Sequence, residues 1–278
     1  MVASISGGKD SAAMSLWLTE QGIEHDRVFC DTGWEAQETY DHLQYLGERL
    51  GPIAVLKGER QMEELVAHKG MFPSRTRRFC TEELKVKPVL AYLAVQVAVG
   101  LDLVNAVGIR AGESKARSQM PEWEWSKGFD CEVWRPLINW TEQDVIDIHT
   151  RHGLLPNPLY LQGASRVGCF PCIFSRKAEI RFVAEQHPEQ IVRIRKMEER
   201  VQVAALARAD ARGEADKFNP PTFFQAPIRD EQGQRKCIPI DDVVAWSKTS
   251  RGGRQQDLFA PGAADEGCMR WGLCEVAE

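Results

Sequence analysis

The chain has 278 residues, of which 43% are hydrophobic and 27% charged, and its formal net charge is −5. These values indicate a globular protein with one large domain, or one domain with a small appendage. No apolar run reaches membrane-spanning length and no signal peptide precedes the first motif, so we expect a cytoplasmic protein without a membrane partner. The acidic balance disfavours broad nucleic-acid binding, and any such contact requires a local basic patch.

The first predicted element is a strand over Val2–Ile5, which leads into a glycine turn and then a helical pattern. This order of elements points backbone N–H groups at an anion. Gly7 and Gly8 permit a tight turn, and Lys9 adds a positive charge. It is not a Walker A loop, because Ala3 stands where that motif requires glycine. The predicted phosphate-binding residues are Ser6, Gly7, Gly8, Lys9, Asp10 and Ser11.

The spacing Ser-Gly-Gly-x-Asp-Ser instead resembles the PP-loop of ATP pyrophosphatases. The resemblance implies that the loop holds the β,γ-pyrophosphate of ATP while an acceptor attacks the α-phosphate and forms an adenylate. Lys9 and Asp10 are then the expected catalytic residues. The alternative is a plain strand-to-helix turn with an incidental lysine.

Strands and helices continue to alternate. We predict strands over 27–30, 53–56 and 101–107, and helices over 37–50, 62–68 and 81–99. Pro88 either opens the last of these helices or kinks it. Repeated βα units predict an α/β fold with a parallel sheet and helices on both faces. Ligands bind beyond the carboxyl ends of such strands, where Ser6–Ser11, Asp31–Gly33 and Gly108–Arg110 all lie.

The strand that ends at residue 30 is followed by Asp31, Thr32 and Gly33. An aspartate at this place can help to position magnesium or ribose, and the next two residues shape the turn. An ordinary β-turn is the alternative. Because a phosphate loop lies beside it, we favour a role in binding an adenine nucleotide.

The strand that ends at residue 107 is followed by Gly108, Arg110, Glu113 and Arg117. The two arginines can clamp phosphates in a bidentate manner. Glu113 can pair with either arginine or help to hold magnesium. A surface loop of salt bridges is the alternative, and the location at a strand end favours the nucleotide site.

The pattern changes after residue 135. A capping sequence at Thr141 predicts a helix that runs to His152, and further helices begin near residue 176 and span 189–212. We therefore predict a nucleotide-binding core over 1–140 and a helical or irregular region over 141–278. His149 and His152 have no carboxylate or cysteine at matching spacing, so we expect them at the surface or in a cap.

Eight cysteines without a secretory signal suggest metal, cluster or redox chemistry rather than a disulfide framework. Cys169 and Cys172 form a CxxC, and Cys80 and Cys274 bring the candidate thiolates to four. Four thiolates suit a 4Fe–4S cluster or a zinc site, which spacing alone does not separate. Cys268 is the alternative fourth ligand. The other cysteines are expected to be small buried hydrophobes: Cys30, Cys131 and Cys237.

Two basic segments are candidate binding sites for the phosphates of a substrate or nucleic acid. One contains Arg75, Arg77 and Arg78, and the other contains Arg251 and Arg254. Nothing in either segment reads a base sequence. A solvated surface turn is the alternative for both.

Together, these motifs resemble the phosphoadenylylsulfate reductase-like branch of the adenine nucleotide α-hydrolase superfamily. The resemblance also rests on Cys80–Pro88, on Arg135–Leu137 with Trp140, and on Gly168–Cys172. It covers most of residues 1–175. It implies a Rossmann-like nucleotide-binding core with a parallel sheet and a helical, cysteine-bearing C-terminal extension.

Two activities compete within this branch. Sulfonucleotide reductases usually lack Gly-Gly-Lys-Asp and carry their nucleophile in a C-terminal Glu-Cys-Gly-Leu/Ile-His motif, which is missing here. Those that bind a cluster have a tandem cysteine pair where this chain has Cys80 and Thr81. The ATP pyrophosphatases of DNA phosphorothioation and related sulfur-insertion systems share the intact loop, the Cys-Thr-x-x-Leu-Lys-x-x-Pro stretch and the CxxC.

The resemblance therefore favours a magnesium-dependent ATP pyrophosphatase that activates a nucleic-acid acceptor, so that sulfur from a cysteine desulfurase partner displaces the adenylate. The implied cofactors are ATP, Mg²⁺ and a 4Fe–4S cluster, with Zn²⁺ as the alternative metal. The alternative functions are a sulfonucleotide reductase that releases sulfite, and a non-catalytic nucleotide-binding subunit with structural zinc. The sequence does not separate a DNA backbone, a tRNA base and a small molecule as acceptors, and it does not encode the oligomeric state.

Overall fold

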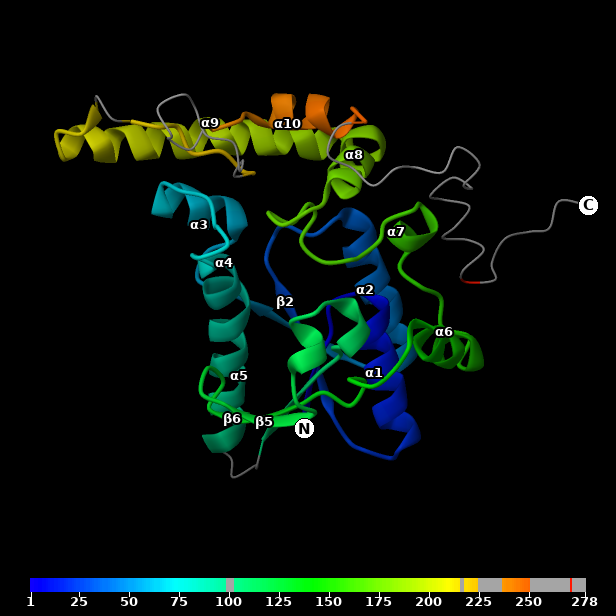
Figure 1. The fold of residues 1–278 in the computed structure, drawn as a ribbon. Coiled ribbons are helices and arrows are strands. Elements are labelled where there is room, and N and C mark those ends of the chain that lie inside the picture. The colour runs from blue at the N-terminus through cyan, green and yellow to red at the C-terminus, as the bar shows by residue number, and fades with distance from the viewer. Residues whose placement is uncertain (99–102, 216–217, 225–236, 251–270, 272–278) are drawn as a thin grey trace, which may run out of the picture. The chain divides into compact units, whose positions relative to one another are not determined.

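The computed structural model describes residues 1–98, 103–215, 218–224, 237–250 and 271 (Figure 1). The chain divides into two compact units, and both are discontinuous in sequence. Unit 1 comprises residues 1–59, 83–168 and 261–278, and unit 2 comprises residues 60–82 and 169–260. The predicted α/β core and helical extension are confirmed, with part of the extension outside the described residues. The division expected at residue 140 stays a prediction.

Unit 1 is built on a six-stranded sheet with the order β3-β2-β1-β4-β6-β5. The strands are β1 (Val2–Ser4), β2 (Asp26–Asp31), β3 (Ile53–Lys57), β4 (Val104–Val107), β5 (Trp123–Ser126) and β6 (Cys131–Trp134). All neighbouring pairs are parallel except β5 and β6, which are antiparallel. The strand order reverses between β1 and β4, and a ligand crevice forms at such a switch point in open α/β sheets.

Helices cover both faces of this sheet. They are α1 (Lys9–Glu20), α2 (Gln37–Leu50), α5 (Lys87–Ala98), α6 (Glu142–Arg151) and α7 (Pro158–Leu161). Along β1, Ala3 faces the core around α1 and α6, whereas its neighbour Val2 faces the core that contains Val89 and Leu93 of α5. This alternation is what a strand buried on both faces requires. A π-helix over Glu82–Val86 precedes α5. Pro88 lies in the first turn of α5, which was one of the two predicted alternatives.

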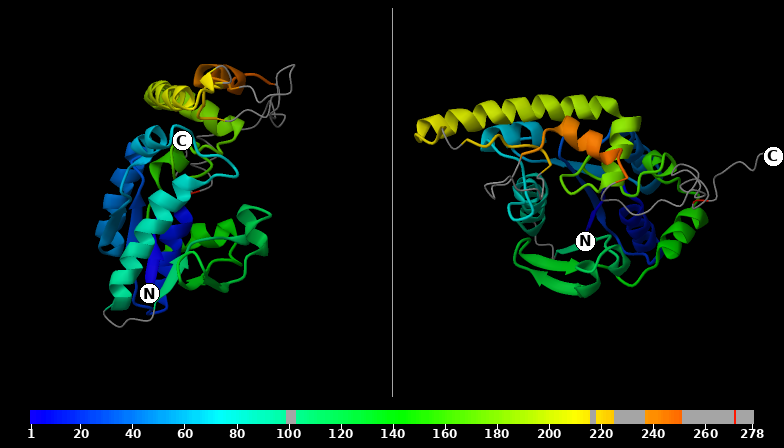
Figure 2. Two further views of the ribbon diagram at one scale, coloured as in Figure 1. Left: turned by 90° about the vertical axis from the view of Figure 1, so that its left-hand side faces the viewer. Right: turned by 45° about the horizontal axis from the view of Figure 1, so that its top comes forward.

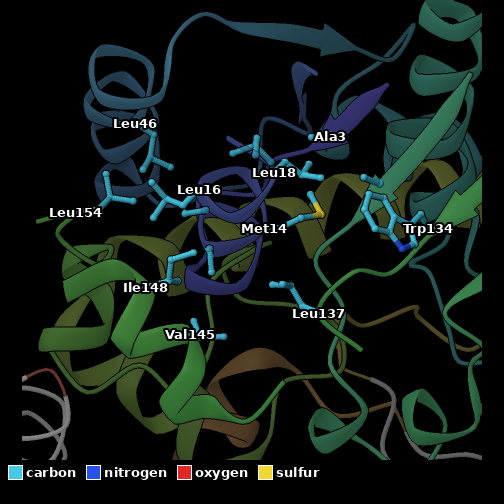
Figure 3. Packing of buried hydrophobic residues seen from close by; sticks show 14 residues of the cluster. Ala3, Met14, Leu16, Leu18, Leu46, Trp134, Leu137, Val145, Ile148 and Leu154 are labelled. Carbon is cyan, nitrogen blue, oxygen red and sulfur yellow. The ribbon is translucent and has the colours of Figure 1, made fainter. Parts of the chain in front are cut away.

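Helix α1 lies at the centre of the larger core of unit 1 (Figure 3). Met14 and Leu18 are fully buried, and Leu46 of α2 packs in the same cluster. Val145 and Ile148 project from α6 toward α1 (Figure 3). Each side chain of this size contributes about 1.5–3 kcal/mol on burial. This packing fixes the N-terminal end of α1, where the glycine turn ends.

Unit 2 is helical in its described part. Its helices are α3 (Met62–Lys69), α4 (Phe79–Thr81), α8 (Lys177–Gln186), α9 (Pro188–Ala211) and α10 (Ile240–Ser247). Helix α9 contacts α3, α8 and α10, and α10 lies alongside it (Figure 2). The buried carboxylate of Glu198 on α9 accepts the backbone N–H of Phe223 at 2.9 Å and of Ile240 at 3.1 Å. Burial raises the pKa of this carboxyl group.

Two elements were not predicted. No element was predicted where the β5–β6 hairpin lies, and α10 falls in the C-terminal stretch expected to be irregular. Both are short elements that are stabilised by packing on distant parts of the chain, because β6 pairs with β4, Trp134 of β6 packs against Trp17 of α1 at 5.6 Å, and α10 packs on α9. None of the described helices has the length and apolar character needed to cross a membrane.

Candidate nucleotide-binding site

The glycine turn lies between β1 and α1, at the carboxyl edge of the sheet. Gly8 is the N-cap of α1, and Gly7 has a φ of +73°, which favours glycine. A Cβ on Gly7 would also lie 2.8 Å from Cγ2 of Thr39 on α2. The turn therefore requires glycine for both its backbone conformation and its contact. It leaves the first-turn N–H groups of α1 at the positive end of the helix dipole.

Two serines brace the turn from within. The Ser11 hydroxyl donates to the Gly8 carbonyl at 2.9 Å and accepts the Ser6 N–H at 3.1 Å. The Gly8 N–H lies 3.4 Å from the Ser6 hydroxyl. The predicted serine at the end of the motif thus holds the loop closed, which explains why a small hydroxyl residue is needed at both ends.

Lys9 and Asp10 lie at the start of α1 in an alternating set of charges. The Lys9 ammonium is 3.4 Å from Oε1 of Glu142 and 3.9 Å from Oδ2 of Asp10, and it lies 4.7 Å from the centre of the Tyr160 ring. Arg110 forms an ion pair with the other oxygen of Asp10. Lys9 and Arg110 are both at least nine-tenths buried. Two cations held in a partly dry site can bind phosphate oxygens more strongly than exposed cations can.

Gly108 explains how Arg110 reaches the loop. A Cβ on Gly108 would lie 2.8 Å from the Asp10 carbonyl oxygen and 2.9 Å from Cα of Ser11. The chain that leaves β4 therefore passes directly against the first turn of α1. Only glycine permits this approach without a shift of backbone.

The predicted loop after β4 folds on itself. The backbone N–H of Arg110 donates to Oε2 of Glu113 at 2.9 Å, and Glu113 also forms an ion pair with Arg117. Glu113 thus closes the turn that orients Arg110. Of the two arginines, Arg110 lies at the phosphate loop, whereas the more exposed Arg117 lies on the outer side of Glu113.

The turn after β2 is held by its own hydrogen bonds. Asp31 accepts the N–H of Gly33 at 2.9 Å and the hydroxyl of Tyr40 at 2.8 Å, and its other oxygen lies 3.2 Å from the Lys57 ammonium. Burial alone raises the pKa of Asp31, but these three partners outweigh it and lower the pKa. The carboxylate is therefore ionised and fixed beside the carboxyl edge of the sheet.

Glu35 completes this turn and was not predicted. Its carboxylate accepts the hydroxyl of Thr32 at 2.7 Å and the N–H groups of Thr32 and Trp34, each at 3.2 Å. The hydroxyl of Tyr40 reaches it at 3.1 Å. Burial and the two carboxylates raise the pKa of Tyr40, so this phenol stays a donor. The predicted Thr32 is a structural part of the turn.

The prediction that His149 lies at the surface is wrong. Its side chain is 1% exposed, and Nε2 lies 2.9 Å from the carbonyl oxygen of Lys9. The apolar stripe of α6 carries the signal that was missed, since Val145 and Ile148 flank His149 at helical spacing on the buried face. His152 lies at the partly exposed end of the helix and contacts Glu20 at 2.6 Å, as expected for a surface residue.

Two further residues from the segment after α6 reach the loop. Asn157 is fully buried, and its amide donates to the carbonyl of Gly7 at 3.1 Å. The hydroxyl of Tyr160 lies 3.4 Å from the Lys9 N–H. Asn157 is also the N-cap of α7, ahead of Pro158, and this capping pattern is its only local signal. No sequence spacing links residues that are about 150 positions away from the loop.

Three of the predicted metal ligands lie in unit 2. Burial raises the pKa of the Cys80 thiol, and Cys172 adds to this effect. Cys169 precedes Cys172 by three residues in a non-helical stretch and belongs to the same unit. Within the described residues, no three His, Cys, Asp or Glu side chains converge on a metal position. The described residues thus do not complete a metal site, and Cys268 and Cys274 lie outside them.

The predicted basic loop is exposed. Arg75, Arg77 and Arg78 all present their side chains to solvent in unit 2. The Arg78 guanidinium lies 5.4 Å from the centre of the Phe174 ring, and this phenylalanine is 38% exposed. The surface therefore combines cations with an aromatic face. Arg251 and Arg254 lie outside the described residues.

Comparisons with known proteins address the family. Residues 1–175 match the phosphoadenosine phosphosulfate reductase domain. An uncharacterised 37.8 kDa protein of Escherichia phage 186 is 34% identical over 316 residues, which cover 93% of this chain and 91% of the phage protein. The adenosine 5′-phosphosulfate reductase of Streptomyces coelicolor is 30% identical over 149 residues, which cover 53% of this chain and 61% of that enzyme.

One solved structure was also compared with this chain. The phosphoadenylyl-sulfate reductase of Candida auris, crystallised as a phosphate complex, has a TM-score of 0.47 and 20% identity, and the match covers 61% of this chain and 81% of the enzyme. The sequence match over residues 1–175 includes the glycine turn, the loop after β4 and the CxxC. The chain belongs to the phosphoadenosine phosphosulfate reductase domain family.

Proposed function

We propose that the chain is a PP-loop ATP pyrophosphatase that activates a nucleic-acid acceptor for sulfur transfer. The observation that carries this proposal is the intact Gly8-Lys9-Asp10 sequence at the start of α1, where the Lys9 and Arg110 side chains both pair with the Asp10 carboxylate. A site that only binds a ready-made sulfonucleotide has no need to hold a departing pyrophosphate. Two buried cations beside a helix N-terminus provide for that charge.

The reaction balances as two displacements. The acceptor oxygen attacks the α-phosphorus of ATP, the bond from that phosphorus to the bridging oxygen breaks, and pyrophosphate leaves with the electron pair. Sulfur from the persulfide of a cysteine desulfurase partner then displaces AMP, which carries the acceptor oxygen away, and a thiol cleaves the remaining sulfur–sulfur bond. Adenylation is necessary because a phosphate or carbonyl oxygen is otherwise a poor leaving group.

The roles of the side chains follow from their positions. Lys9 and the first-turn amides of α1 hold the β- and γ-phosphates, and Arg110 shares its charge between Asp10 and a phosphate oxygen. Mg²⁺, when bound, neutralises the departing pyrophosphate, and Asp10 and Glu142 offer the oxygen donors that it prefers. Asp31, Thr32 and Gly33 form the neighbouring wall on which we place the nucleoside.

A nucleic acid is the acceptor class that the surface of unit 2 favours. The chain as a whole is acidic, yet Arg75, Arg77 and Arg78 are exposed together. Arginine binds phosphate in a bidentate manner, and an exposed aromatic ring such as Phe174 can stack on an unpaired base. We assign Arg251 and Arg254 to the same role because of their sequence pattern alone.

A 4Fe–4S cluster on Cys80, Cys169, Cys172 and either Cys274 or Cys268 is part of the proposal. Its support is that Cys80, Cys169 and Cys172 belong to one compact unit, although 92 positions separate Cys80 from Cys172 in the sequence. Zn²⁺ is the alternative occupant. The cluster supplies sulfide relay or a structural brace, and no step above depends on it.

The test is release of AMP and pyrophosphate from ATP in the presence of single-stranded DNA or tRNA. We expect Lys9→Met and Asp10→Asn to lower that release at least ~100-fold, because the first removes a cation at the departing group and the second removes a charged oxygen donor for Mg²⁺ and the ion-pair partner of Arg110. Lys127→Met is the matched control, since Lys127 is an exposed lysine of the same unit. A wild-type protein that never forms AMP and pyrophosphate with any nucleic acid would contradict the proposal.

A sulfonucleotide reductase is the second candidate, and the observation that favours it is the 30% identity to the reductase of Streptomyces coelicolor. It would reduce adenylylsulfate or phosphoadenylylsulfate with a thiol donor and release sulfite. Incubation with each sulfonucleotide and a thioredoxin, followed by sulfite measurement, separates the two candidates. Sulfite release without formation of pyrophosphate from ATP would support the reductase.

A further inference from the structure

Two peptide groups of the phosphate loop are anchored from behind. The amide of Asn157 donates to the carbonyl of Gly7 at 3.1 Å, and a ring nitrogen of His149 lies 2.9 Å from the carbonyl of Lys9. These carbonyls belong to the peptide groups that carry the N–H of Gly8 and of Asp10. The C=O and N–H of a trans peptide point in opposite directions, so a donor that holds the carbonyl also aims the amide. The hydrogen bond to the carbonyl also polarises the peptide group, so that its N–H becomes a stronger donor.

His149 faces carbonyl oxygens with both ring nitrogens. Nε2 lies 2.9 Å from the Lys9 carbonyl, and Nδ1 lies 3.2 Å from the Leu154 carbonyl. A carbonyl only accepts, and a neutral imidazole has only one N–H. One of the two contacts is therefore satisfied in the neutral ring, and both are satisfied only in the imidazolium. The ring is 1% exposed, so water does not supply the missing partner.

Burial and the charges around the ring together decide which form is present. Lys9 on α1 and His42 on α2 oppose a positive ring, and Asp10 on α1 favours it. Trp271 meets the ring edge-on at 5.2 Å and carries no charge. Burial is the largest influence, and it lowers the pKa of His149. A polyphosphate bound at Lys9 would add negative charge near the ring and offset the charge of the Lys9 ammonium.

We propose that His149 is a positioning residue of the phosphate loop, which holds the Lys9–Asp10 peptide through its first proton and takes up a second proton when a polyphosphate binds. The proposal rests on the nucleotide site described above and adds a coupling between that site and pH. By linkage, the affinity for the polyphosphate rises as pH falls, in the window between the pKa of His149 in the free protein and its higher pKa in the complex.

Isothermal titration calorimetry with inorganic pyrophosphate as the probe measures this coupling. Titrations in buffers of different ionisation enthalpy give the number of protons taken up on binding. We expect a larger uptake for the wild type than for His149→Gln as the pH is lowered from neutral, and an affinity that falls more steeply with rising pH, by up to about tenfold in total for each unit by which binding raises the pKa of His149. Pyrophosphate itself changes protonation in both titrations, so subtracting the proton uptake of His149→Gln from that of the wild type cancels this contribution.

Two variants distinguish a positioning role of His149 from a purely structural role. His149→Gln keeps one N–H donor for the Lys9 carbonyl, so we expect it to match the wild type at pH 8. His149→Ala lacks that donor, and we expect it to bind pyrophosphate more weakly at every pH. His152→Gln is the matched control, because His152 lies on the same helix but contacts Glu20 rather than the loop. Circular dichroism melts establish that each variant is folded.

The outcomes are distinct for the two proposals. Equal proton uptake by the wild type and His149→Gln would overturn the role of His149, even if AMP and pyrophosphate are formed. Pyrophosphate binding with the expected proton uptake, but without AMP formation from ATP, would overturn the pyrophosphatase and leave the role of His149 in place. A wild-type protein that does not bind pyrophosphate would overturn both.

Discussion

At the scale of single residues, Gly108 is the tightest contact of the site. A Cβ at this position would meet the Asp10 carbonyl and Cα of Ser11, both of which are backbone atoms that cannot move aside. We expect Gly108→Ala to lower the free energy of unfolding by about 1–3 kcal/mol and to weaken nucleotide binding, because the first turn of α1 must shift. Urea denaturation and ATP titration measure the two effects. Gly112→Ala is the control, since nothing lies within 4 Å of its Cβ position, and equal losses in both variants would refute the argument.

His42 predicts a pH dependence of stability. Burial, and then the charge of His149, lower the pKa of His42 from 6.5 to about 4. The unfolded chain therefore binds a proton that the native protein excludes, so that stability is full above pH 6.5 and falls as the pH drops toward 4. The loss is on the order of 3 kcal/mol. We expect His42→Phe, which preserves the stacking on Tyr45, to flatten this part of the profile of unfolding free energy against pH. An unchanged slope between pH 6.5 and 4 would contradict the assignment, and His152→Gln provides the control.

At the scale of elements, α6 carries His149 to the loop, and its first turn is held by a capping box. The Thr141 hydroxyl accepts the Asp144 N–H at 3.2 Å, and Asp144 accepts the Thr141 N–H at 2.7 Å. We expect Thr141→Ala to lower the unfolding free energy by about 1 kcal/mol. Gln143→Ala, at an exposed position of the same turn, should change it by less than about 0.5 kcal/mol. Chemical denaturation at pH 7 measures both, and a loss no larger than that of the control would show that the cap does not hold the helix.

Elements with strong local signals were predicted well. The helix expected over 37–50 has those bounds as α2, and the first three strands lie within a residue or two of their expected positions. The hairpin of β5 and β6 was missed because β6 is held by β4 and by Trp17 of α1, and no two-residue Asn-Gly or Asp-Gly turn joins its strands. Local patterns carry local structure, and this hairpin is stabilised by a non-local contact.

The candidate site divides in the same way. Its predicted residues, from Ser6 to Ser11 and at Arg110, follow strand ends, which a parallel sheet brings to one edge. The residues behind the loop come from α6 and from the segment after it, and the hydrogen bond from His149 to Lys9 joins positions 140 residues apart. No periodicity or motif in the sequence predicts a contact between residues so far apart in the chain. The buried stripe of α6 indicates that His149 is inside, but not what it contacts.

At the scale of the whole molecule, the proposed cluster draws its cysteine ligands from segments that are far apart in the sequence. Cys80 belongs to the short first segment of unit 2, and Cys169 and Cys172 belong to its second segment. We expect anaerobically purified protein to contain about four irons per chain and to show a broad visible band, which Cys80→Ser reduces strongly. Cys131→Ser is the matched control, because Cys131 is a buried cysteine of β6. A colourless protein with one zinc per chain would contradict the cluster and indicate a zinc site instead.

Because each unit is built from separate segments of the sequence, a truncation of the chain can remove the packing partner of a retained helix. The family match ends at residue 175, but the segment 60–82 inside it belongs to unit 2, whose α3 packs on α9 far beyond that point. A chain shortened to the matched residues would leave Met62, Leu65 and Val66 of α3 without the helix that buries them. We therefore expect a fragment that ends at residue 175 to expose this apolar face of α3 and to be less stable than the full chain.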